Sequence, residues 1–594
     1  MHSVKVFYQE QSEDCAKQLA SISYRLKWLA FFRLLAFLMI FVPFFIFGLN
    51  GWISLSVSLA ALFVFFFLVK KHIQTERKQK ETAIRKKLAE DELLALDHKF
   101  SQFKNGNEFS DPDHFYSFDL DLFGEGSLFQ FLNRTVSIGG REKLAGWLSS
   151  PDLTGKTIGE KQKAIRELSE NNEWRMKFRV AGLFFEEDEP LHKEMLDWSA
   201  KGLQLPKASL IKTLLWLVPL LTFAALVPAI MGFSKLFVWS MVVFQWSLLV
   251  YFRKEVSFYF QYFGRKTALL DKYLSVLKII ETSDFKAENL AGLKQKTTSP
   301  EPAGRIVSGL KTWVDRFEYR QNIIVMFLLN SLLLWDIRCM FHLWRWHNKN
   351  HSKLASWLDV IAEFDAFVSL ANYAANQSQF VYPEVVENDF VYSAKELGHP
   401  LLESRKRICN DFEIRDWSKV MIITGANMAG KSTFLRTVGI NLVLSCAGAP
   451  VCAAGMKFTP VLLYTNMRTT DSLQKEESYF FAELKRIKRV LDLLDQGISV
   501  FVILDEMLKG TNSVDKLNGS KALVEKLTRL KSVSLVATHD LKLSEMEYEI
   551  PGKVENRCFE IRIVNDEMIF DYKLSEGITQ TMNATFLMRK MGII

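Results

Sequence analysis

Residues 419–433 read KVMIITGANMAGKST, and this stretch decides the fold of the C-terminal part of the chain. Its first five residues form a short apolar run typical of a buried strand, and residues 434–440 are typical of a helix. Gly425 and Gly430 bound the loop between them, with the spacing of a P-loop. Backbone amides in such a loop close around phosphate oxygens, and the following helix adds its positive dipole end. The stretch therefore predicts a nucleotide site.

The P-loop spacing assigns roles to the residues at the start of the helix. We expect Lys431 to neutralise the β- and γ-phosphates of ATP, and the Ser432 hydroxyl to ligate Mg²⁺. The residues expected to contact the nucleotide are Gly425, Ala426, Asn427, Met428, Ala429, Gly430, Lys431, Ser432 and Thr433.

Two further apolar runs end in polar residues that suit ATP hydrolysis. Residues 500–504 precede Asp505 and Glu506, and residues 533–538 precede His539. We expect Asp505 to hold the magnesium shell and Glu506 to orient or deprotonate the attacking water. His539 is expected to sense the γ-phosphate through a hydrogen bond, although a lone histidine is more often a structural residue. Three apolar strands alternating with helices predict an α/β domain with a parallel sheet and nucleotide at its carboxyl edge.

Length and composition set broader limits on the molecule. A chain of 594 residues is too long for one core, so several domains are expected. The net charge of +8 suits nucleic acid or an anionic membrane surface and is specific for neither. The six cysteines include no CxxC pair, which argues against a disulfide framework or a zinc site and favours a reducing compartment.

Four uncharged apolar stretches predict two transmembrane helical hairpins. Residues 34–69 hold no charged residue and carry Asn50-Gly51 at their centre, enough for two spans and a tight turn. Residues 213–234 and 236–252 form the second pair. Basic residues flank both pairs, so each hairpin is expected to start and end in the cytoplasm. This predicts a multi-pass membrane protein with a cytoplasmic ATPase domain; the alternative is two pairs of buried helices in a large soluble core.

The remaining segments are expected to be helical. Residues 72–100 are rich in Lys, Glu and Gln, which predicts an exposed helix with a solvated charged face. Apolar residues at helical spacing in 128–132 and 144–148 indicate helices packed on a core. The apolar run 323–335 is short for a span and is expected to be a buried core helix.

These motifs resemble those of the MutS family of DNA mismatch-repair ATPases. The P-loop of that family reads TGPNMGGKST, and the pair Asn427-Met428 is the distinguishing match. The family motif DExxxGTSTxD is similar to residues 505–515, and its ATH motif to residues 537–539. Residues 119–148 resemble the opening of the family's core domain. The resemblance covers about residues 115–200 and 255–594 and is most specific in the last part of the chain.

The resemblance implies a homodimer formed through the ATPase domains. Ser478, in a segment similar to the family motif GxSTFxxEM, would approach the γ-phosphate held by the other subunit. Glu476 stands where that motif has glycine, so a carboxylate would weaken this contact. The mismatch-reading domain of the family, with its Phe-x-Glu wedge, and the connector domain find no room before residue 115. The letters of Phe184-Phe185-Glu186 match the wedge, but packing is the expected role of these residues.

Together these features predict an α-helical MutS-type core and lever with two transmembrane hairpins, followed by an α/β P-loop (ABC-type) ATPase domain. The expected order is N-terminal head (1–28), hairpin (29–71), helical linker (72–110), first core part (111–210), second hairpin (211–254), lever and second core part (255–382) and ATPase domain (383–594).

The expected function is a membrane-anchored ATPase that couples ATP binding and hydrolysis to binding of mismatch-repair or recombination-type DNA. With no wedge domain, the DNA contacts are expected to go mostly to backbone phosphates or to branched structures. Two alternatives remain open: an ABC-type ATPase coupled to membrane cargo, and a membrane-tethered scaffold switched by nucleotide. The presence of Lys431, Asp505, Glu506 and His539 favours hydrolysis.

Overall fold

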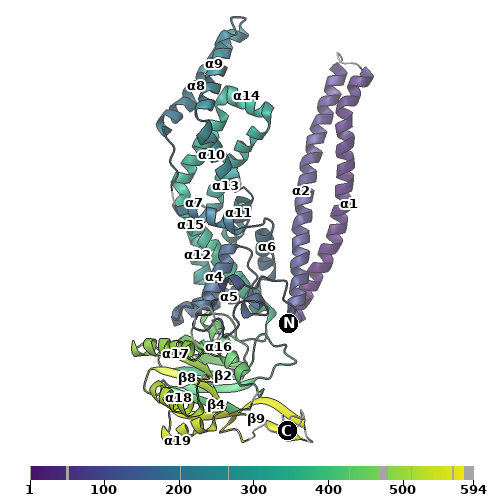
Figure 1. Ribbon diagram of the computed structural model, residues 1–594. Helices are drawn as coiled ribbons and strands as arrows, with labels where there is room; N and C mark the ends of the chain where they lie inside the picture. The colour runs from purple at the N-terminus through teal and green to yellow at the C-terminus, as the bar shows by residue number, and fades with distance from the viewer. Residues whose placement is uncertain are drawn as a thin grey trace.

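The computed structural model describes residues 2–47, 52–200, 202–264, 267–426, 428–468, 479–509, 511–564 and 567–580. An α/β domain forms one end of the molecule, and a helical body lies next to it (Figure 1). Two long helical projections reach from the body away from the α/β domain. The molecule is thus mostly helical with a C-terminal α/β domain, as the sequence predicts.

The first projection is an antiparallel hairpin of two long helices, α1 (His2–Phe47) and α2 (Trp52–Leu96). The predicted N-terminal head and first span are one continuous helix. The most apolar stretches of both helices are only 11% buried, and side chains such as Phe45 and Trp52 are almost fully exposed. Phe184 packs beneath basic residues of α2, with the Lys80 ammonium 4.7 Å from its ring centroid.

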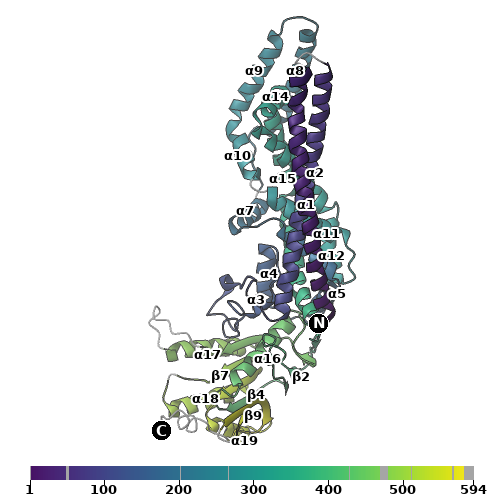
Figure 2. The same ribbon diagram turned by 90° about the vertical axis from the view of Figure 1, so that its right-hand side faces the viewer.

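The second projection, here called the arm, carries α8 (Ala208–Ile230), α9 (Leu236–Tyr251), α10 (Arg253–Gly264) and α14 (Ile323–Leu333) (Figure 2). In the described part of the chain, α1, α2 and α8 are long and apolar enough to cross a membrane. Two bent pairs, α9 with α10 and α14 with α15, reach the same apolar character when each is taken together.

The prediction of a buried core helix at residues 323–335 is wrong. The exposed fractions of Ile323 and Ile324 are 77% and 72%, and those of Phe327 and Leu328 are 46% and 53%. The helix α14 contacts α8, α9 and α15, yet these four side chains stay exposed, so its apolar composition does not reflect burial within the protein.

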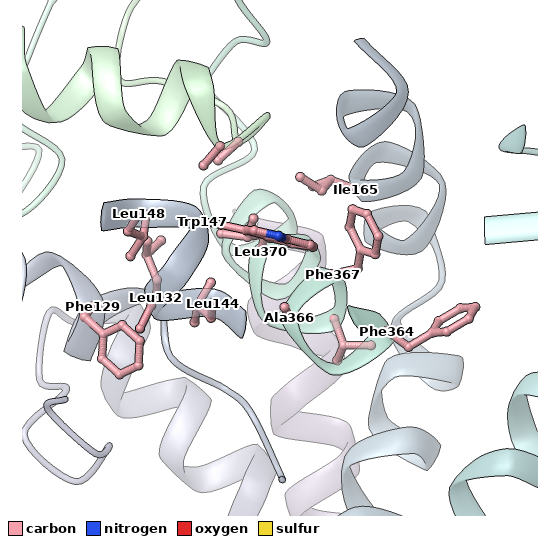
Figure 3. Close-up of a cluster of buried hydrophobic side chains, with 14 of the residues drawn as sticks. Phe129, Leu132, Leu144, Trp147, Leu148, Ile165, Phe364, Ala366, Phe367 and Leu370 are labelled. Carbon is pink, nitrogen blue, oxygen red and sulfur yellow. The ribbon is translucent and has the colours of Figure 1, made fainter. Parts of the chain in front are cut away.

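The helical body is organised around α15 (Trp335–Asn376), which runs from the arm to the α/β domain (Figure 1). Trp147 packs against Phe367 of α15 with ring centroids 4.7 Å apart, among leucine and phenylalanine side chains (Figure 3). The helices that surround α15 are α3 (Leu128–Leu132), α4 (Ile138–Ser149), α5 (Gly155–Glu170), α6 (Asn172–Leu183), α7 (Glu189–Ala200), α11 (Thr267–Thr282), α12 (Glu288–Thr298) and α13 (Ala303–Phe317).

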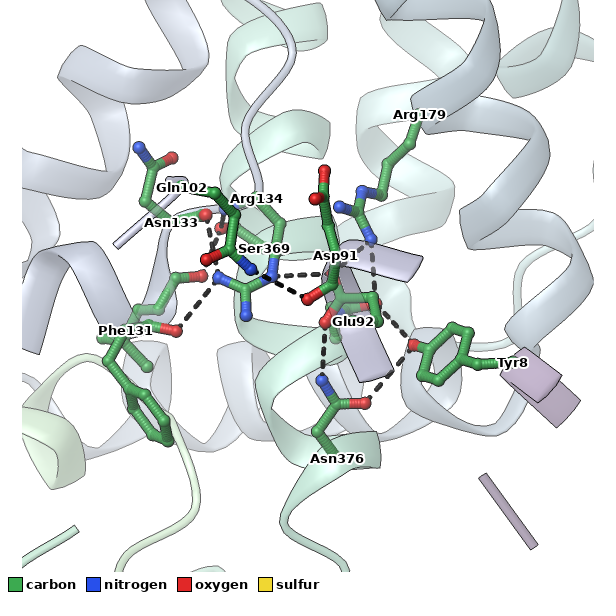
Figure 4. A network of polar contacts seen from close by, with 12 residues as sticks. Tyr8, Asp91, Glu92, Gln102, Phe131, Asn133, Arg134, Arg179, Ser369 and Asn376 are labelled. Carbon is green, nitrogen blue, oxygen red and sulfur yellow. Dashed lines mark hydrogen bonds and ion pairs between the residues drawn. The ribbon is translucent and has the colours of Figure 1, made fainter. Parts of the chain in front are cut away.

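A buried polar network joins the base of the first projection to the body (Figure 4). Glu92 of α2 is fully buried and receives hydrogen bonds from Arg134 (2.7 Å), Arg179 (2.7 Å) and Asn376 (2.8 Å). Burial alone would raise the pKa of Glu92, but the two guanidinium groups lower it to about 2. The prediction of a solvated charged face for residues 72–100 is therefore wrong at this end of the helix.

The α/β domain contains a six-stranded sheet in the order β10-β9-β4-β8-β7-β6. The three predicted strands, β4 (Lys419–Gly425), β8 (Ser532–Thr538) and β7 (Val500–Asp505), are parallel neighbours, which confirms the predicted parallel sheet. Only β10 runs antiparallel to its neighbour. The other strands of this sheet are β6 (Leu462–Asn466), β9 (Val554–Val564) and β10 (Glu567–Glu576), and the covering helices are α16 (Lys431–Cys446), α17 (Tyr479–Asp495), α18 (Ser513–Leu527) and α19 (Met546–Glu549).

A second, four-stranded sheet lies against the first, in the order β1-β5-β2-β3. Tyr392 of this sheet stacks on Phe501 of β7 with ring centroids 5.9 Å apart, so the two sheets share one apolar core. The strands are β1 (Glu384–Val385), β2 (Val391–Leu397), β3 (Asn410–Arg415) and β5 (Gly455–Phe458).

Candidate nucleotide-binding site

The glycine-bounded loop joins the end of β4 to the start of α16, as the sequence predicts. Gly430 has a φ of 103°, and a Cβ there would lie 3.0 Å from the ring of Tyr572. Gly425 has a φ of 156°, and a Cβ there would lie 2.9 Å from the carbonyl oxygen of Phe559. Both positions require glycine, because an L side chain would be strained and would also meet neighbouring atoms.

Lys431 is buried at the first position of α16, inside the loop. Its ammonium donates hydrogen bonds to the carbonyl oxygens of Gly425 (2.6 Å) and Ala426 (3.0 Å). Burial lowers the pKa of Lys431 to about 8, although Asp505 and Glu506 oppose this shift. A partly desolvated cation at the N-terminus of a helix provides a strong site for a phosphate group.

Ser432 and Asp505 lie in contact across the end of the sheet. The Ser432 hydroxyl donates a hydrogen bond to the Asp505 carboxylate, with an oxygen–oxygen distance of 2.5 Å. Among the residues that the structure describes, no three His, Cys, Asp or Glu side chains gather into a metal site. One hydroxyl and one carboxylate fit Mg²⁺, which in nucleotide sites completes its oxygen shell with phosphates and waters.

Glu506 and His539 form a close pair at the ends of β7 and β8. The imidazole Nε2 of His539 lies 2.8 Å from the Glu506 carboxylate. The Lys509 ammonium lies 3.6 Å from the same carboxylate. The hydrogen bond from His539 lowers the pKa of Glu506 to about 2, helped by the charges of His539 and Lys509. The same imidazole lies 3.4 Å from the Lys431 ammonium, so it touches both the acid and the phosphate-facing end of the site.

These residues line one cavity of about 720 Å³ at the carboxyl edge of the sheet. Ala426, Met428, Gly430 and Thr433 also line it, whereas Gly425 and Ala429 of the predicted contact residues do not. Residues from distant segments, which sequence reasoning missed, form one side of the cavity: His399, Leu402, Ile408, Phe559 and Tyr572. They follow no motif spacing, because β2–β3 and the β9–β10 pair bring them together only in the folded domain.

His399 is the titratable member of that missed group. Burial lowers its pKa to about 4, helped by the charges of Arg436 and Arg407. The imidazole is therefore neutral near pH 7, and with Ile408 and Tyr572 it adds apolar and aromatic surface to a lining that also includes Lys406 and Asn410.

One more residue near the site, Glu483 of α17, was not predicted from the sequence. It follows the segment that is expected to reach the partner subunit. Glu483 is 1% exposed and accepts hydrogen bonds from the backbone N–H groups of Leu508 (2.6 Å) and Lys509 (3.1 Å). It thus fixes the backbone that follows Glu506. Asn427, Ser478 and Glu476 lie outside the described residues.

Comparison with known proteins covers the same part of the chain. The MutS domain V family model matches residues 421–587, which include the loop, Asp505, Glu506 and His539. MutS protein homolog 4 of Mus musculus is 29% identical over 275 residues, 45% of this chain and 26% of that protein. DNA mismatch repair protein MutS of Lachnoclostridium phytofermentans is 31% identical over 226 residues, 36% of this chain and 24% of that protein.

A third relative matches over a similarly small share of its own length. DNA mismatch repair protein MutS of Aquifex pyrophilus is 31% identical over 234 residues, 39% of this chain and 27% of that protein. The matches thus span about a quarter of the length of these curated relatives. The C-terminal domain of this chain, over residues 421–587, is therefore similar to domain V of the MutS family.

Proposed function

We propose that the chain is a magnesium-dependent ATPase whose nucleotide site is the cavity at the carboxyl edge of the six-stranded sheet. The observation that carries this proposal is the convergence of Lys431, the Ser432–Asp505 pair and the Glu506–His539 pair on one cavity. Each of these side chains has the chemistry that phosphoryl transfer to water requires. The match of residues 421–587 to MutS domain V supports the same assignment.

The residues divide the work of hydrolysis as follows. Lys431 would exchange the loop carbonyls for phosphate oxygens, and backbone N–H groups of the glycine-bounded loop would surround the phosphates. Ser432 and Asp505 hold Mg²⁺, which neutralises phosphate charge when bound. The cavity side with His399, Ile408 and Tyr572 suits the flat, weakly polar base of ATP.

Glu506 and His539 provide the hydrolytic step and its control. With a pKa of about 2, Glu506 orients the attacking water well but is a weak base. If His539 turns toward a γ-phosphate, Glu506 loses the hydrogen bond that lowers its pKa most. The imidazole therefore acts as a switch that makes Glu506 more basic when nucleotide is in place.

We further propose that ATP turnover is coupled to DNA, through a homodimer formed by the ATPase domains. Two of the relatives described above are named DNA mismatch repair proteins, and a net charge of +8 favours a polyanion. The contacts would go mostly to backbone phosphates or branched DNA. In the dimer, Ser478 of one subunit would complete the γ-phosphate site of the other.

The test of the DNA coupling is the ATPase rate of the full chain with linear, mismatched and four-way-junction DNA. We expect stimulation that falls steeply between about 50 mM and about 200 mM salt, because phosphate contacts release counterions. Absence of both stimulation and DNA binding at low salt would overturn this part of the proposal.

The apolar projections lead us to propose a multi-pass membrane protein, anchored by four transmembrane helices with the ATPase domain in the cytoplasm. The apolar stretches of α1, α2 and α8 leave most of their surface exposed, and α9 carries exposed Phe237, Trp239 and Val243. Exposed apolar area costs about 25 cal/mol per Å² in water, so such helices need a lipid environment. Alkaline carbonate extraction should leave the chain in the membrane pellet; release into the supernatant would contradict anchoring.

A second candidate function is a membrane-tethered, nucleotide-switched ATPase with a target other than DNA. The observation that favours it is the Glu92 network, which ties the first projection to Asn376 at the end of α15, directly before the ATPase domain. A nucleotide-dependent change at the projections without any DNA binding would select this candidate.

A further inference from the structure

We propose that α14 is an in-plane membrane helix whose outer face lies in the acyl layer of the bilayer crossed by α8 and α9. The inference rests on the proposed membrane anchoring and extends it to a segment that does not cross. The sequence interpretation, which placed this segment in the protein core, gives no such role.

Because of its length and direction, α14 cannot cross the bilayer by itself. Its 11 residues span about 16 Å, roughly half of the hydrocarbon thickness of a bilayer. Leu334, with a φ of 50°, ends the helix, and α15 leaves at an angle of 79°. Because α15 follows the length of the arm, α14 lies across it (Figure 1).

The exposed residues of α14 are all apolar and lie in its first six positions. Ile323, Ile324, Phe327 and Leu328 are 46% to 77% exposed, and no charged residue occurs between positions 323 and 333. A surface helix of a soluble protein shows the opposite arrangement, with polar residues outward. The exposed apolar surface of α8 and α9 lies on the neighbouring helices, so the three helices share one lipid-facing surface.

The polar groups of α14 point into the protein instead. Ser331 is buried; its hydroxyl accepts a hydrogen bond from the Trp246 indole (3.0 Å) and its carbonyl accepts one from Gln245 (2.9 Å). Gln245 also donates to the Thr222 hydroxyl of α8 at 2.7 Å. Interhelical hydrogen bonds of this kind satisfy polar groups where water is absent.

These contacts also fix the depth of α14. Gln245 lies about 12 Å along α9 from Arg253, the first charged residue at its cytoplasmic end. The helix therefore lies within the cytoplasmic half of the acyl layer. The basic residues that flank the helix are held by the protein: Arg320 lies 3.4 Å from the buried carboxylate of Asp336, and Arg338 donates a hydrogen bond to the carbonyl oxygen of Leu215 at 2.7 Å.

The test is spin-label accessibility in the full chain, reconstituted in vesicles of phosphatidylcholine and phosphatidylglycerol. The background is Cys409→Ser, because the other five cysteines are buried. Labels at Ile324→Cys, Phe327→Cys and Leu328→Cys probe α14. Labels at Trp216→Cys and Leu220→Cys probe α8, and Tyr548→Cys is the water-exposed control.

We expect the α14 labels to collide with oxygen several-fold more than with a water-soluble nickel chelate, as the α8 labels do. The depths of positions 324 and 328 should differ by less than about 2 Å, whereas positions 216 and 220 should differ by about 6 Å. Water-like α14 labels beside lipid-like α8 labels would overturn this inference and leave the anchoring intact. A depth difference of about 6 Å between positions 324 and 328 would also overturn the in-plane orientation of α14. Water-like labels on both α14 and α8 would overturn the proposed membrane anchoring itself.

Discussion

The imidazole of His539 lies 2.8 Å from the carboxylate of Glu506 and 3.4 Å from the ammonium of Lys431. One side chain thus lies next to both the carboxylate proposed to orient the attacking water and the ammonium proposed to bind the phosphates. The pair brings together two strand ends, β7 and β8, that are neighbours in the sheet. If a γ-phosphate binds this imidazole as proposed, Glu506 loses the hydrogen bond that lowers its pKa most.

Replacing Glu506 with glutamine should abolish turnover without abolishing nucleotide binding. The amide keeps the size of the side chain but cannot accept a proton, so kcat should fall about 10²- to 10⁴-fold. ATP should remain bound, and the dimer should persist in size-exclusion chromatography with light scattering. Glu545→Gln, at an exposed position of the same domain, is the matched control and should leave turnover unchanged. Equal turnover in the wild type and Glu506→Gln would refute the role of Glu506.

ATP affinity should weaken as the pH rises above about 8. The pKa of Lys431 is about 8, so its ammonium is charged below this pH and loses its proton above it. Only the charged form attracts phosphate, so the Kd of a non-hydrolysable ATP analogue should rise by up to about tenfold per pH unit. Lys431→Arg stays charged throughout and should show a flat profile. The same pH dependence in both proteins would contradict this assignment.

The Ser432–Asp505 contact predicts a specific defect in magnesium use. Asp505→Asn and Ser432→Ala should each raise the Mg²⁺ concentration for half-maximal ATPase activity by about 10- to 100-fold, because each removes an oxygen group from the metal shell. Asp495→Asn changes an exposed carboxylate on α17 and serves as the control. An unchanged magnesium titration in Asp505→Asn would show that the metal is held elsewhere.

The Glu92 network should contribute strongly to stability. Glu92→Gln leaves two buried guanidinium groups without a counter-charge, which costs about 3–5 kcal/mol of unfolding free energy. Glu90→Gln removes only an exposed ion pair with Lys86 and should cost less than about 1 kcal/mol. Denaturant unfolding of the full chain in detergent measures both. Equal stabilities of the two variants would contradict the network.

The contribution of Glu92 to the free energy of unfolding should depend on pH. The pKa of Glu92 is lowered in the folded chain to about 2 from an ordinary value of 4.5. The stabilisation is therefore fully present above pH 4.5 and is lost as the pH falls toward 2. Glu92→Gln should lose this acid-dependent part of the unfolding curve, and Glu90→Gln should keep it.

The central strands of the α/β domain and the glycine-bounded loop after β4 could be predicted because their signals are local. Residues 419–433 combine an apolar run, two glycines and a basic residue at fixed spacing, and each part specifies the backbone next to it. Asp505 and His539 were predictable because both follow apolar runs, and parallel strands bring their carboxyl ends to one edge. His399 and Tyr572 carry no such spacing, and only the folded domain brings them to the same cavity.

The two wrong predictions have a common physical cause. For α14, an apolar run predicts burial in protein, but its exposed side chains show that apolar composition does not specify what surrounds a helix. For α2, charged residues predict exposure to solvent, but Glu92 is buried beside Leu88, Ala89 and Ala95. Spacing gives the face on which a residue lies and not the partner that covers it.

The central claim is that the loop around Lys431 binds ATP, and equilibrium binding of ATP to the full chain tests it most directly. Lys431→Ala removes the phosphate-facing cation, and Lys542→Ala, which removes an exposed lysine of the same domain, is the control. We expect the wild type and Lys542→Ala to retain ATP with the same Kd and Lys431→Ala to lose at least about 100-fold in affinity, the loss of one charge-assisted phosphate contact. Retention of ATP by Lys431→Ala at the wild-type Kd, or no retention by any of the three proteins, would contradict the account.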